Sequence, residues 1–321
     1  MINHDLLTFG PVPSRRLGHS LGINNIPPKV CSYSCIYCQL GRTLDMQAER
    51  KVFYKPEEIL KNVEKKIKDA KGKREPIDYL TFVPDGEPTL DLNLGKEIEL
   101  LKPLGIRIAV ISNASLIWQE DVRDDLCKAD WVSLKIDAIS EDIWRGVNRP
   151  HKFFQLDKIF RGIIEFSRTF KRKLATETML IKDINDNTEE IGKIINFIAG
   201  LKDAKSYISI PTRPPAEKWV KPANEHAINT AYQLFKEKSI DAEYLIGYEG
   251  NAFAFTGNIE QDLLSITSVH PMRKEAVDEF LKKVNENWAI IEKLIAENKL
   301  IETEYKDNKF YIRKLTRAED A

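Results

Sequence analysis

Three of the four cysteines in this chain lie within eight residues, at Cys31, Cys35 and Cys38. Thiolates are soft ligands, and three of them on one short loop suit an iron–sulfur cluster. A structural zinc site is the alternative, but it needs four ligands and no second Cys/His pair lies nearby. A disulfide framework fits poorly, because this chain has 321 residues and its first residues do not resemble a signal peptide. A cluster held by three cysteines leaves one iron open for a substrate or cofactor.

Groups that could bind such a molecule follow two predicted strands. The strand in IDYLTFV is followed by DGEPT, which contains Gly86 and Glu87, and the strand in IRIAVIS ends at Ser112 and Asn113. A carboxylate and strand-end carbonyls accept hydrogen bonds from an ammonium group, while Ser and Asn side chains can bind a ribose or a carboxylate. Taken alone, DGEPT also fits an ordinary turn, and Ser112-Asn113 a helix cap or turn. Their position at strand ends favours a binding role.

The cysteine spacing, with the aromatic Tyr37 before the last cysteine, resembles the signature of the radical S-adenosylmethionine (SAM) superfamily. The resemblance implies a [4Fe-4S] cluster on the three cysteines and SAM on the open iron, where reductive cleavage gives methionine and a 5′-deoxyadenosyl radical. It also implies that Tyr37 belongs to the SAM site and that Gly86 and Glu87 match a Gly-Gly-Glu segment receiving the SAM amino group. Asp85 stands in place of the first glycine of that segment. The implied partner is an electron donor of flavodoxin or ferredoxin type.

Within this superfamily, the segments FGPVPSRRLG, DGEPTLD, SLKIDA and RPPAEKWVKP resemble a branch related to the wyosine-forming tRNA enzymes, over about residues 8 to 222. Those enzymes carry additional cysteines for a second cluster, and here only Cys127 remains. The cysteine count therefore excludes a second three-cysteine cluster, and the tRNA reaction is not carried over. Cys127 lies in the helical pattern DVRDDLCKAD, and we interpret it as a half-buried structural thiol.

Charged residues on two later strands are further candidates. In SLKID, Lys135 and Asp137 lie on the same face because side chains alternate along a strand. A lysine inside a barrel needs a charge partner, and Asp137 is the nearest carboxylate in sequence. The two residues could form a structural ion pair or bind SAM or substrate. Glu177, in ATETML, presents the same two alternatives.

Two arginines in later loops could bind a substrate. Arg149 lies in WRGVNRPH and Arg213 in PTRPPAEKW. Arginine binds carboxylate and phosphate groups, but it also forms surface ion pairs of little consequence. The prolines around Arg213 stiffen its loop, which favours a binding site there.

Alternating helical and strand patterns must position these residues. Strands are predicted near 20–25 and at 77–83, 106–112, 131–137, 173–181 and 205–210, and helices at 55–70, 94–105, 119–128, 153–169, 188–200 and 223–237. Strands separated by helices predict right-handed crossovers and a parallel sheet. About six units predict an α/β fold with a partial (β/α)6 barrel, which agrees with the family resemblance. Active groups in such barrels lie at the carboxyl ends of the strands.

The pattern changes after residue 258. Three helical stretches, at 259–268, 272–284 and 286–298, precede an alternating segment that turns at Asp307-Asn308. Three helices and a hairpin resemble a winged helix. We therefore divide the chain into a barrel domain (1–258) and a winged-helix-like domain (259–321), joined by a hinge at 255–258.

The amino-acid composition limits which classes of partner we expect. Lys and Arg together number 49, as do Asp and Glu, so the net charge is zero and no global field favours nucleic acid. No apolar stretch approaches the roughly 20 residues of a membrane span. We expect a cytoplasmic protein without a membrane partner, where thiols stay reduced.

The leading hypothesis is a radical SAM enzyme that abstracts hydrogen from an RNA or a protein or peptide substrate. No individual catalytic residue can be assigned from the sequence. The alternative is an iron–sulfur redox-sensing regulator with a winged-helix module that binds nucleic acid, but such a protein would not need Glu87, Asn113 or so long a barrel. Residues 259–321 contain 11 Lys and Arg against 13 Asp and Glu, a poor balance for binding DNA.

Overall fold

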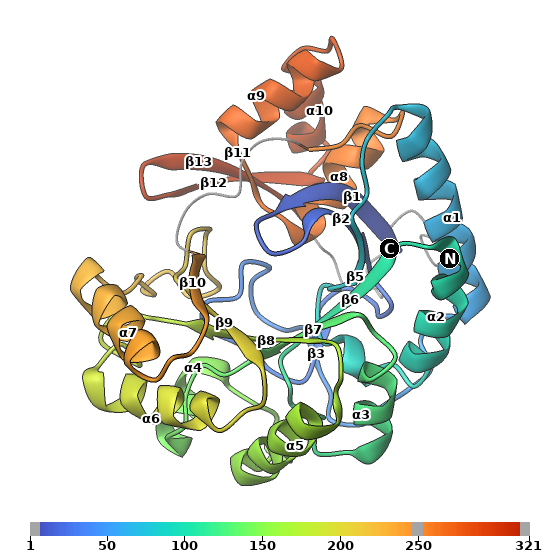
Figure 1. Cartoon of the computed structure of the whole chain (residues 1–321). Coiled ribbons are helices and arrows are strands. Elements are labelled where there is room, and N and C mark those ends of the chain that lie inside the picture. The colour runs from blue at the N-terminus through green and yellow to red at the C-terminus, as the bar shows by residue number, and fades with distance from the viewer. Residues whose placement is uncertain (1–6, 246–252, 315–321) are drawn as a thin grey trace.

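The computed structural model describes residues 7–245 and 253–314, and its main feature is a curled eight-stranded sheet (Figure 1). The strand order is β1-β2-β5-β6-β7-β8-β9-β10. β1 (Thr8–Ser14) runs antiparallel to β2 (Gly18–Ile23), and every following neighbour is parallel. The other strands are β5 (Tyr79–Phe82), β6 (Arg107–Ser112), β7 (Trp131–Lys135), β8 (Lys173–Met179), β9 (Ala204–Ser209) and β10 (Ala242–Leu245). The carboxyl ends of the parallel strands therefore meet at one edge.

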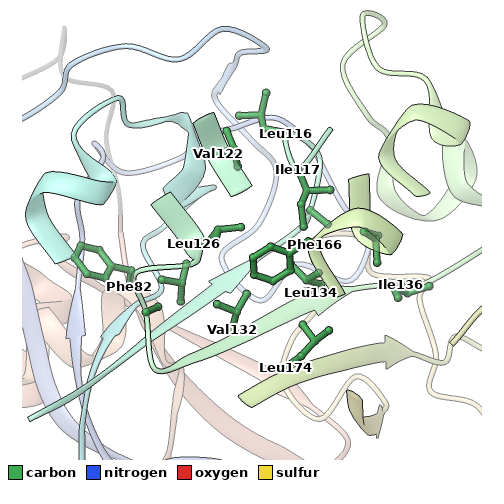
Figure 2. Close-up of a cluster of buried hydrophobic side chains, with 14 of the residues drawn as sticks. Phe82, Leu116, Ile117, Val122, Leu126, Val132, Leu134, Ile136, Phe166 and Leu174 are labelled. Atoms are coloured by element: carbon green, nitrogen blue, oxygen red, sulfur yellow. The ribbon is translucent and has the colours of Figure 1, made fainter. Parts of the chain in front are cut away.

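Helices cover the outer face of this sheet (Figure 1). They are α1 (Pro56–Gly72), α2 (Leu94–Leu101), α3 (Glu120–Leu126), α4 (Glu141–Asn148), α5 (Leu156–Thr169), α6 (Thr188–Ala199) and α7 (Glu225–Glu237). Asn187 and Asn224 start two of them, because each side chain accepts a hydrogen bond from a backbone N–H of the first turn. Figure 2 shows the resulting packing, with Phe166 of α5 against the apolar side chains of β7 and β8. Burial of these apolar faces fixes the strand ends in space.

The predicted α/β class and all six predicted strands are confirmed, and the strand count is corrected. β10 adds a seventh parallel strand, and β1 adds an antiparallel edge. β10 is only four residues long, too short for a clear alternation, and β1 contains Pro11 and Pro13. Proline removes a backbone donor, which an edge strand tolerates. Helix α4 was also not expected, because its residues 144–148 belong to WRGVNRPH, a segment interpreted as a loop.

Residues 253–314 form three helices and a small sheet. The helices are α8 (Ile259–Val269), α9 (Lys274–Lys283) and α10 (Ala289–Ala296), and the strands are β11 (Met272–Arg273), β12 (Leu300–Tyr305) and β13 (Asn308–Arg313), in the order β11-β13-β12. The hairpin turn lies one residue earlier than predicted, at Lys306-Asp307. Both residues have positive φ, at 50° and 58°, and Asn308 already pairs with Tyr305. Two central residues with positive φ give the twist that suits a two-residue hairpin.

The C-terminal helices share a hydrophobic core with the first strand of the chain. Phe9 and Val12 of β1 pack in one buried cluster with Phe253, Leu263 and Ile266. A buried ion pair, Lys66 Nζ to Asp262 Oδ1 at 2.9 Å, joins α1 to α8. The described residues contain no helix with both the length and the apolar character needed to cross a membrane.

Candidate active site

The three clustered cysteines lie on the loop after β2, which we call the cysteine loop (residues 29–44). Cys31, Cys35 and Cys38 line a cavity of about 300 Å³ at the carboxyl ends of the parallel strands. In the described part of the chain, no three His, Cys, Asp or Glu side chains are grouped as ligands of one metal ion. A [4Fe-4S] cube distributes three thiolates over three iron atoms, so its ligands need not converge on one point. The spacing and placement of the sulfurs therefore fit a cluster better than a single zinc ion.

Amide groups point at two of the sulfurs. Asn113 Nδ2 lies 3.7 Å from Cys31 Sγ, and Asn148 Nδ2 lies 3.5 Å from Cys35 Sγ. Burial raises the pKa of the Cys31 thiol to about 12, and burial with the nearby Asp137 raises that of Cys35 as well. Both thiols are therefore protonated at neutral pH unless a metal replaces the proton. An N–H donor beside each sulfur suits the thiolate that iron would create.

Glu87 joins the loops after β5 and β6. Its Oε1 accepts hydrogen bonds from Thr89 N (3.1 Å), Thr89 Oγ1 (2.6 Å) and Ser112 Oγ (2.7 Å), and its Oε2 accepts one from Asn113 N (2.7 Å). The side chain is buried, and burial raises its pKa although these donors oppose the shift. Four internal donors occupy the carboxylate. Its direct effect is therefore to fix the strand-end loops whose backbone lines the cavity.

Asn113 connects this network to the cysteine loop. Its Nδ2 also donates to Ser32 Oγ at 2.8 Å, and its Oδ1 accepts from Ser115 N at 2.9 Å. Ser32 Oγ in turn lies 2.7 Å from Ser115 Oγ. The structure thus brings together Glu87, Ser112, Asn113 and the first cysteine, as the strand-end argument predicts.

Asp137 joins the other side of the cysteine loop to the barrel. Its Oδ2 accepts hydrogen bonds from the Tyr37 hydroxyl and from Asn148 Nδ2 (2.8 Å), and its Oδ1 accepts from Met179 N (2.9 Å). Burial and the Asp137 charge raise the pKa of Tyr37, so its hydroxyl stays protonated and acts as the donor. Asp137 therefore orients the aromatic ring that precedes Cys38.

The expected pairing of Lys135 with Asp137 is wrong. Lys135 Nζ binds Glu177 Oε1 at 2.7 Å, because the two residues are register partners on β7 and β8. The guanidinium of Arg16 binds the other oxygen of Glu177, and Ser209 Oγ donates to Oε1 at 3.1 Å. Burial opposes ionisation, but the two cations prevail and lower the pKa of Glu177 to about 2. Lys135, Glu177 and Arg16 all line the cavity and together carry one excess positive charge.

The two loop arginines occupy different places. Arg213 lines the cavity, where it donates to Gln39 Oε1 at 2.9 Å and lies 2.8 Å from His270 Nε2 of the C-terminal helices. Arg149 does not line the cavity, and its guanidinium binds Glu217 at 2.5 Å on the outer side of the cysteine loop. The geometry thus places Arg213, but not Arg149, beside a molecule in the cavity.

A second cavity, of about 380 Å³, lies between the cysteine loop and the C-terminal sheet. It shares Lys29, Gln39 and Leu40 with the first cavity, and Ile301 and Ile312 of β12 and β13 form its other wall. Tyr305 also donates a hydrogen bond to the backbone oxygen of Pro211 at 3.1 Å. The C-terminal sheet therefore forms a wall beside the mouth of the barrel.

Three site residues were missed by sequence reasoning. Arg50 lies on a loop, yet its side chain is 5% exposed and binds Asp121 and Asp125 at 2.5 and 2.6 Å. It also donates to the backbone oxygens of Thr89 and Asp91, so it holds the segment after Glu87. Arg16 was not predicted either, because its carboxylate partner Glu177 is 161 residues away in the sequence.

The third such residue is Asp85, which the sequence did not identify as a buried ionisable group. Its side chain is buried, and neither carboxylate oxygen has a hydrogen-bond partner among the described residues. Burial raises its pKa to about 7, although Lys29 and Arg313 oppose the shift. The family resemblance identifies Asp85 only as a residue that stands in place of a glycine.

Comparisons with known proteins point to one superfamily. A family model described as the radical SAM superfamily matches residues 25–198. A UPF0026 protein of Methanocaldococcus jannaschii is 50% identical over 311 residues, which is 96% of each chain. A probable dual-specificity RNA methyltransferase RlmN of Shouchella clausii is 25% identical over 222 residues, covering 66% of this chain and 60% of that protein. The structure of a radical SAM methyltransferase from Sphaerobacter thermophilus aligns with a TM-score of 0.56 at 14% identity, over 71% of this chain and 66% of that one.

Proposed function

Because this chain belongs to the radical SAM superfamily, whose members use a [4Fe-4S] cluster and SAM, we propose that it is an enzyme that cleaves SAM reductively to act on a substrate in the 300 Å³ cavity. When bound, the cluster supplies the electron that cleaves SAM into methionine and a 5′-deoxyadenosyl radical, which abstracts hydrogen from the substrate. The observation that carries the proposal is that Cys31, Cys35 and Cys38 share one cavity with Glu87 and Asn113.

The residues of this chain have separable tasks in the proposal. Cys31, Cys35 and Cys38 hold the cluster, while Asn113 and Asn148 donate hydrogen bonds to two of the thiolates. Glu87 fixes the backbone of the strand-end loops that line the cavity, and carbonyl groups of that backbone would accept hydrogen bonds from the SAM ammonium group.

We assign other cavity residues to binding a negatively charged group and to keeping water away from a radical. Lys135 and Arg16, with Glu177 between them, leave one positive charge that suits a carboxylate of SAM or substrate. Apolar groups in the wall, including Ile111, Ile210 and Leu245, limit the access of water to a radical.

The experiment that tests the proposal is anaerobic reconstitution with iron and sulfide, followed by reduction with dithionite in the presence of SAM. We expect 5′-deoxyadenosine and methionine in equal amounts, measured by liquid chromatography and mass spectrometry. A reconstituted cluster that never yields 5′-deoxyadenosine would contradict the proposal. Incubation with cellular RNA and with cellular protein would then identify which class of substrate raises the rate.

For the substrate, the proposal keeps RNA and a protein or peptide. The relative from Shouchella clausii is named as an RNA methyltransferase, which supports RNA. The order of helices and strands in residues 259–313 supports a winged-helix-like unit, which we propose positions a macromolecular substrate at the second cavity. Glu292 and Glu297 on and beside α10 oppose a role for that helix in a DNA groove.

The alternative, a redox-sensing regulator, makes a different prediction in the same experiment. It requires binding to an operator that depends on the cluster and not on SAM, with no 5′-deoxyadenosine. We also propose a cytoplasmic location, because reduced thiols and an oxygen-sensitive cluster suit that compartment.

A further inference from the structure

The cysteine loop has a second face, outside the cavity. Two segments hydrogen-bond to its backbone from that side: Ile36 N donates to Val147 O at 3.0 Å, and Glu217 N donates to Ile36 O at 3.0 Å. His151 N also donates to Ser32 O at 3.0 Å. We define the outer rim as six side chains of these segments and of the cysteine loop that lie outside the 300 Å³ cavity, namely Arg42, Arg149, Lys152, Phe153, Lys218 and Trp219. None of the six lines the 300 Å³ cavity, and of the six only Arg42 lines the second cavity.

The outer rim contains two unusual aromatic side chains. Among the phenylalanines and tryptophans that the structure describes, only Phe153 and Trp219 are exposed, at 57% and 53%. All the others are buried or half-buried. Exposed aromatic side chains are typical of the anchors in protein–protein interfaces. Both anchors lie on the two segments that contact the cysteine loop.

The outer rim is also positively charged. Arg42 and Arg149 share a single carboxylate, Glu217, at 2.9 and 2.5 Å. Lys152 and Lys218 are exposed and form no ion pair with the described residues. The rim and Glu217 together therefore carry three net positive charges, in a chain whose formal net charge is zero. Such a surface attracts an acidic partner and speeds its association.

We propose that the outer rim is the docking surface for an acidic electron-donor protein of flavodoxin type, a partner that rests on the function proposed above. A substrate bound at the rim would be separated from the cavity by the cysteine loop, so it could not meet a radical formed there. An electron needs no open path, and the rim segments are hydrogen-bonded to the loop that carries the cysteines. One electron passes from the reduced flavin, which is oxidised by one electron, to the cluster, which is reduced from the 2+ to the 1+ state, and no covalent bond is made or broken.

The charge test compares two reductants on the reconstituted, full-length protein. In stopped-flow measurements, the Lys152→Glu/Lys218→Glu double variant should slow cluster reduction by reduced flavodoxin about tenfold or more at low salt, because rim charges act mainly on association. Reduction by dithionite, a small molecule that needs no docking surface, should be unchanged. High salt should slow the wild type towards the variant. The Lys65→Glu/Lys68→Glu double variant, at two exposed lysines on α1, is the matched charge control, and Figure 1 shows α1 far from α4 and the rim segment that follows it.

The docking test measures binding without turnover. Oxidised flavodoxin is titrated into the holoprotein by calorimetry, and Phe153→Ala and Trp219→Ala should each weaken binding about tenfold, with the Lys65→Glu/Lys68→Glu control unaffected. Equal loss of reduction by flavodoxin and by dithionite would show damage to the cluster site and overturn the proposal, as would unchanged flavodoxin kinetics in the double variant. Binding of RNA or a peptide at the rim in place of flavodoxin would also overturn it. Failure of the enzyme proposal is distinct, because it would appear as absent 5′-deoxyadenosine while rim-dependent reduction persists.

Discussion

Lys135 and Glu177 are register partners on β7 and β8, and Lys135 Nζ lies 2.7 Å from Glu177 Oε1 inside the barrel. The Arg16 guanidinium binds the second oxygen of the same carboxylate. One buried anion thus binds two cations that are 161 and 42 residues away from it in the sequence. This arrangement contributes one net positive charge to the cavity wall, and it makes the stability of the barrel depend on Glu177.

Glu177→Gln should destabilise the protein by about 3–5 kcal/mol at pH 7, because two buried cations lose their partner. The matched control is Glu243→Gln, whose exposed ion pair with Lys205 should cost at most about 1 kcal/mol. The pKa of Glu177 is lowered to about 2 in the folded protein. Its stabilisation is therefore complete above the unfolded pKa of about 4.3 and lost as the pH falls towards 2. Urea unfolding between pH 2 and 7 measures both effects, and equal pH slopes in wild type and variant would contradict this account.

Asp85→Asn should stabilise the folded protein at high pH, which is the opposite of the effect expected for Glu177→Gln. The folded pKa of about 7 is above the ordinary value, so the stabilisation from protonated Asp85 is present below about pH 4 and lost as the pH rises through 7. A neutral amide removes that loss, and because burial raises the pKa from 3.8 to about 7, the gain in the free energy of unfolding at pH 8 can reach about 4 kcal/mol. Unfolding of the cluster-free protein at pH 4 and pH 8 measures it. A variant that gains nothing at pH 8 would show that ionised Asp85 is compensated.

Replacing Cys31, Cys35 or Cys38 by Ala should abolish the iron–sulfur absorption and the paramagnetic resonance of the reduced protein. Three thiolates bind three of the four irons of a [4Fe-4S] cube and leave the fourth iron open. Cys127→Ala is the matched control, since this half-buried thiol lies at the end of α3 and does not line the cavity. Iron and sulfide analysis after reconstitution measures the result. A full complement of iron in Cys35→Ala would refute the assignment.

Glu87→Gln should lower stability and SAM affinity together. The carboxylate accepts four hydrogen bonds, and an amide nitrogen in place of Oε2 would face the Asn113 N–H. Loss of a charge-assisted bond costs roughly 1.5–3 kcal/mol. Urea unfolding and SAM titration, followed by the resonance of the reduced cluster, measure the two effects. Weakened SAM binding with unchanged stability would mean that Glu87 contacts SAM directly.

Truncation after residue 257 should destabilise the remaining barrel. Phe9 and Val12 would lose their cover from α8, Lys66 would lose Asp262, and Arg213 would lose His270. We expect a lower unfolding temperature and binding of a hydrophobic dye. A truncated protein as stable as the full chain, with the same basal cleavage of SAM, would support the independent domain that the sequence pattern suggests.

The strand ends could be predicted because each is encoded locally. The alternation in SLKID predicted that Lys135 faces the cavity, although Asp137 on the same strand face does not line it. The polar residues at the end of the strand in IRIAVIS predicted that Ser112 and Asn113 line it, and Asn113 lies beside Cys31. The cysteine spacing was equally local. These features depend on residues a few positions apart, which a single sequence displays directly.

The partners of buried charges could not be predicted in this way. Asp137 lies two positions from Lys135, but register pairs Lys135 with Glu177 across the sheet. Arg50 gave no local signal, because its carboxylate partners are 71 and 75 residues away. β1 was missed because Pro11 and Pro13 argue against a strand unless the edge position is known. In each case the contact that determines the structure joins residues far apart in the sequence, and the neighbouring residues do not indicate it.

The core that Phe9 and Val12 share with α8 has a consequence for synthesis on the ribosome. β1 leaves the ribosome about 250 residues before α8, the helix that covers it. At roughly 5–20 residues per second, the apolar face of β1 therefore stays uncovered for on the order of 10–50 s. During that interval β1 is an uncovered apolar edge strand, which is the kind of surface that chaperones protect. Because the cysteine loop follows β1 and β2 in the chain, its cysteines leave the ribosome before the part of the core formed by residues 253–300 exists. Insertion of iron during translation would therefore meet an unfinished core, whereas insertion after release would meet the completed barrel.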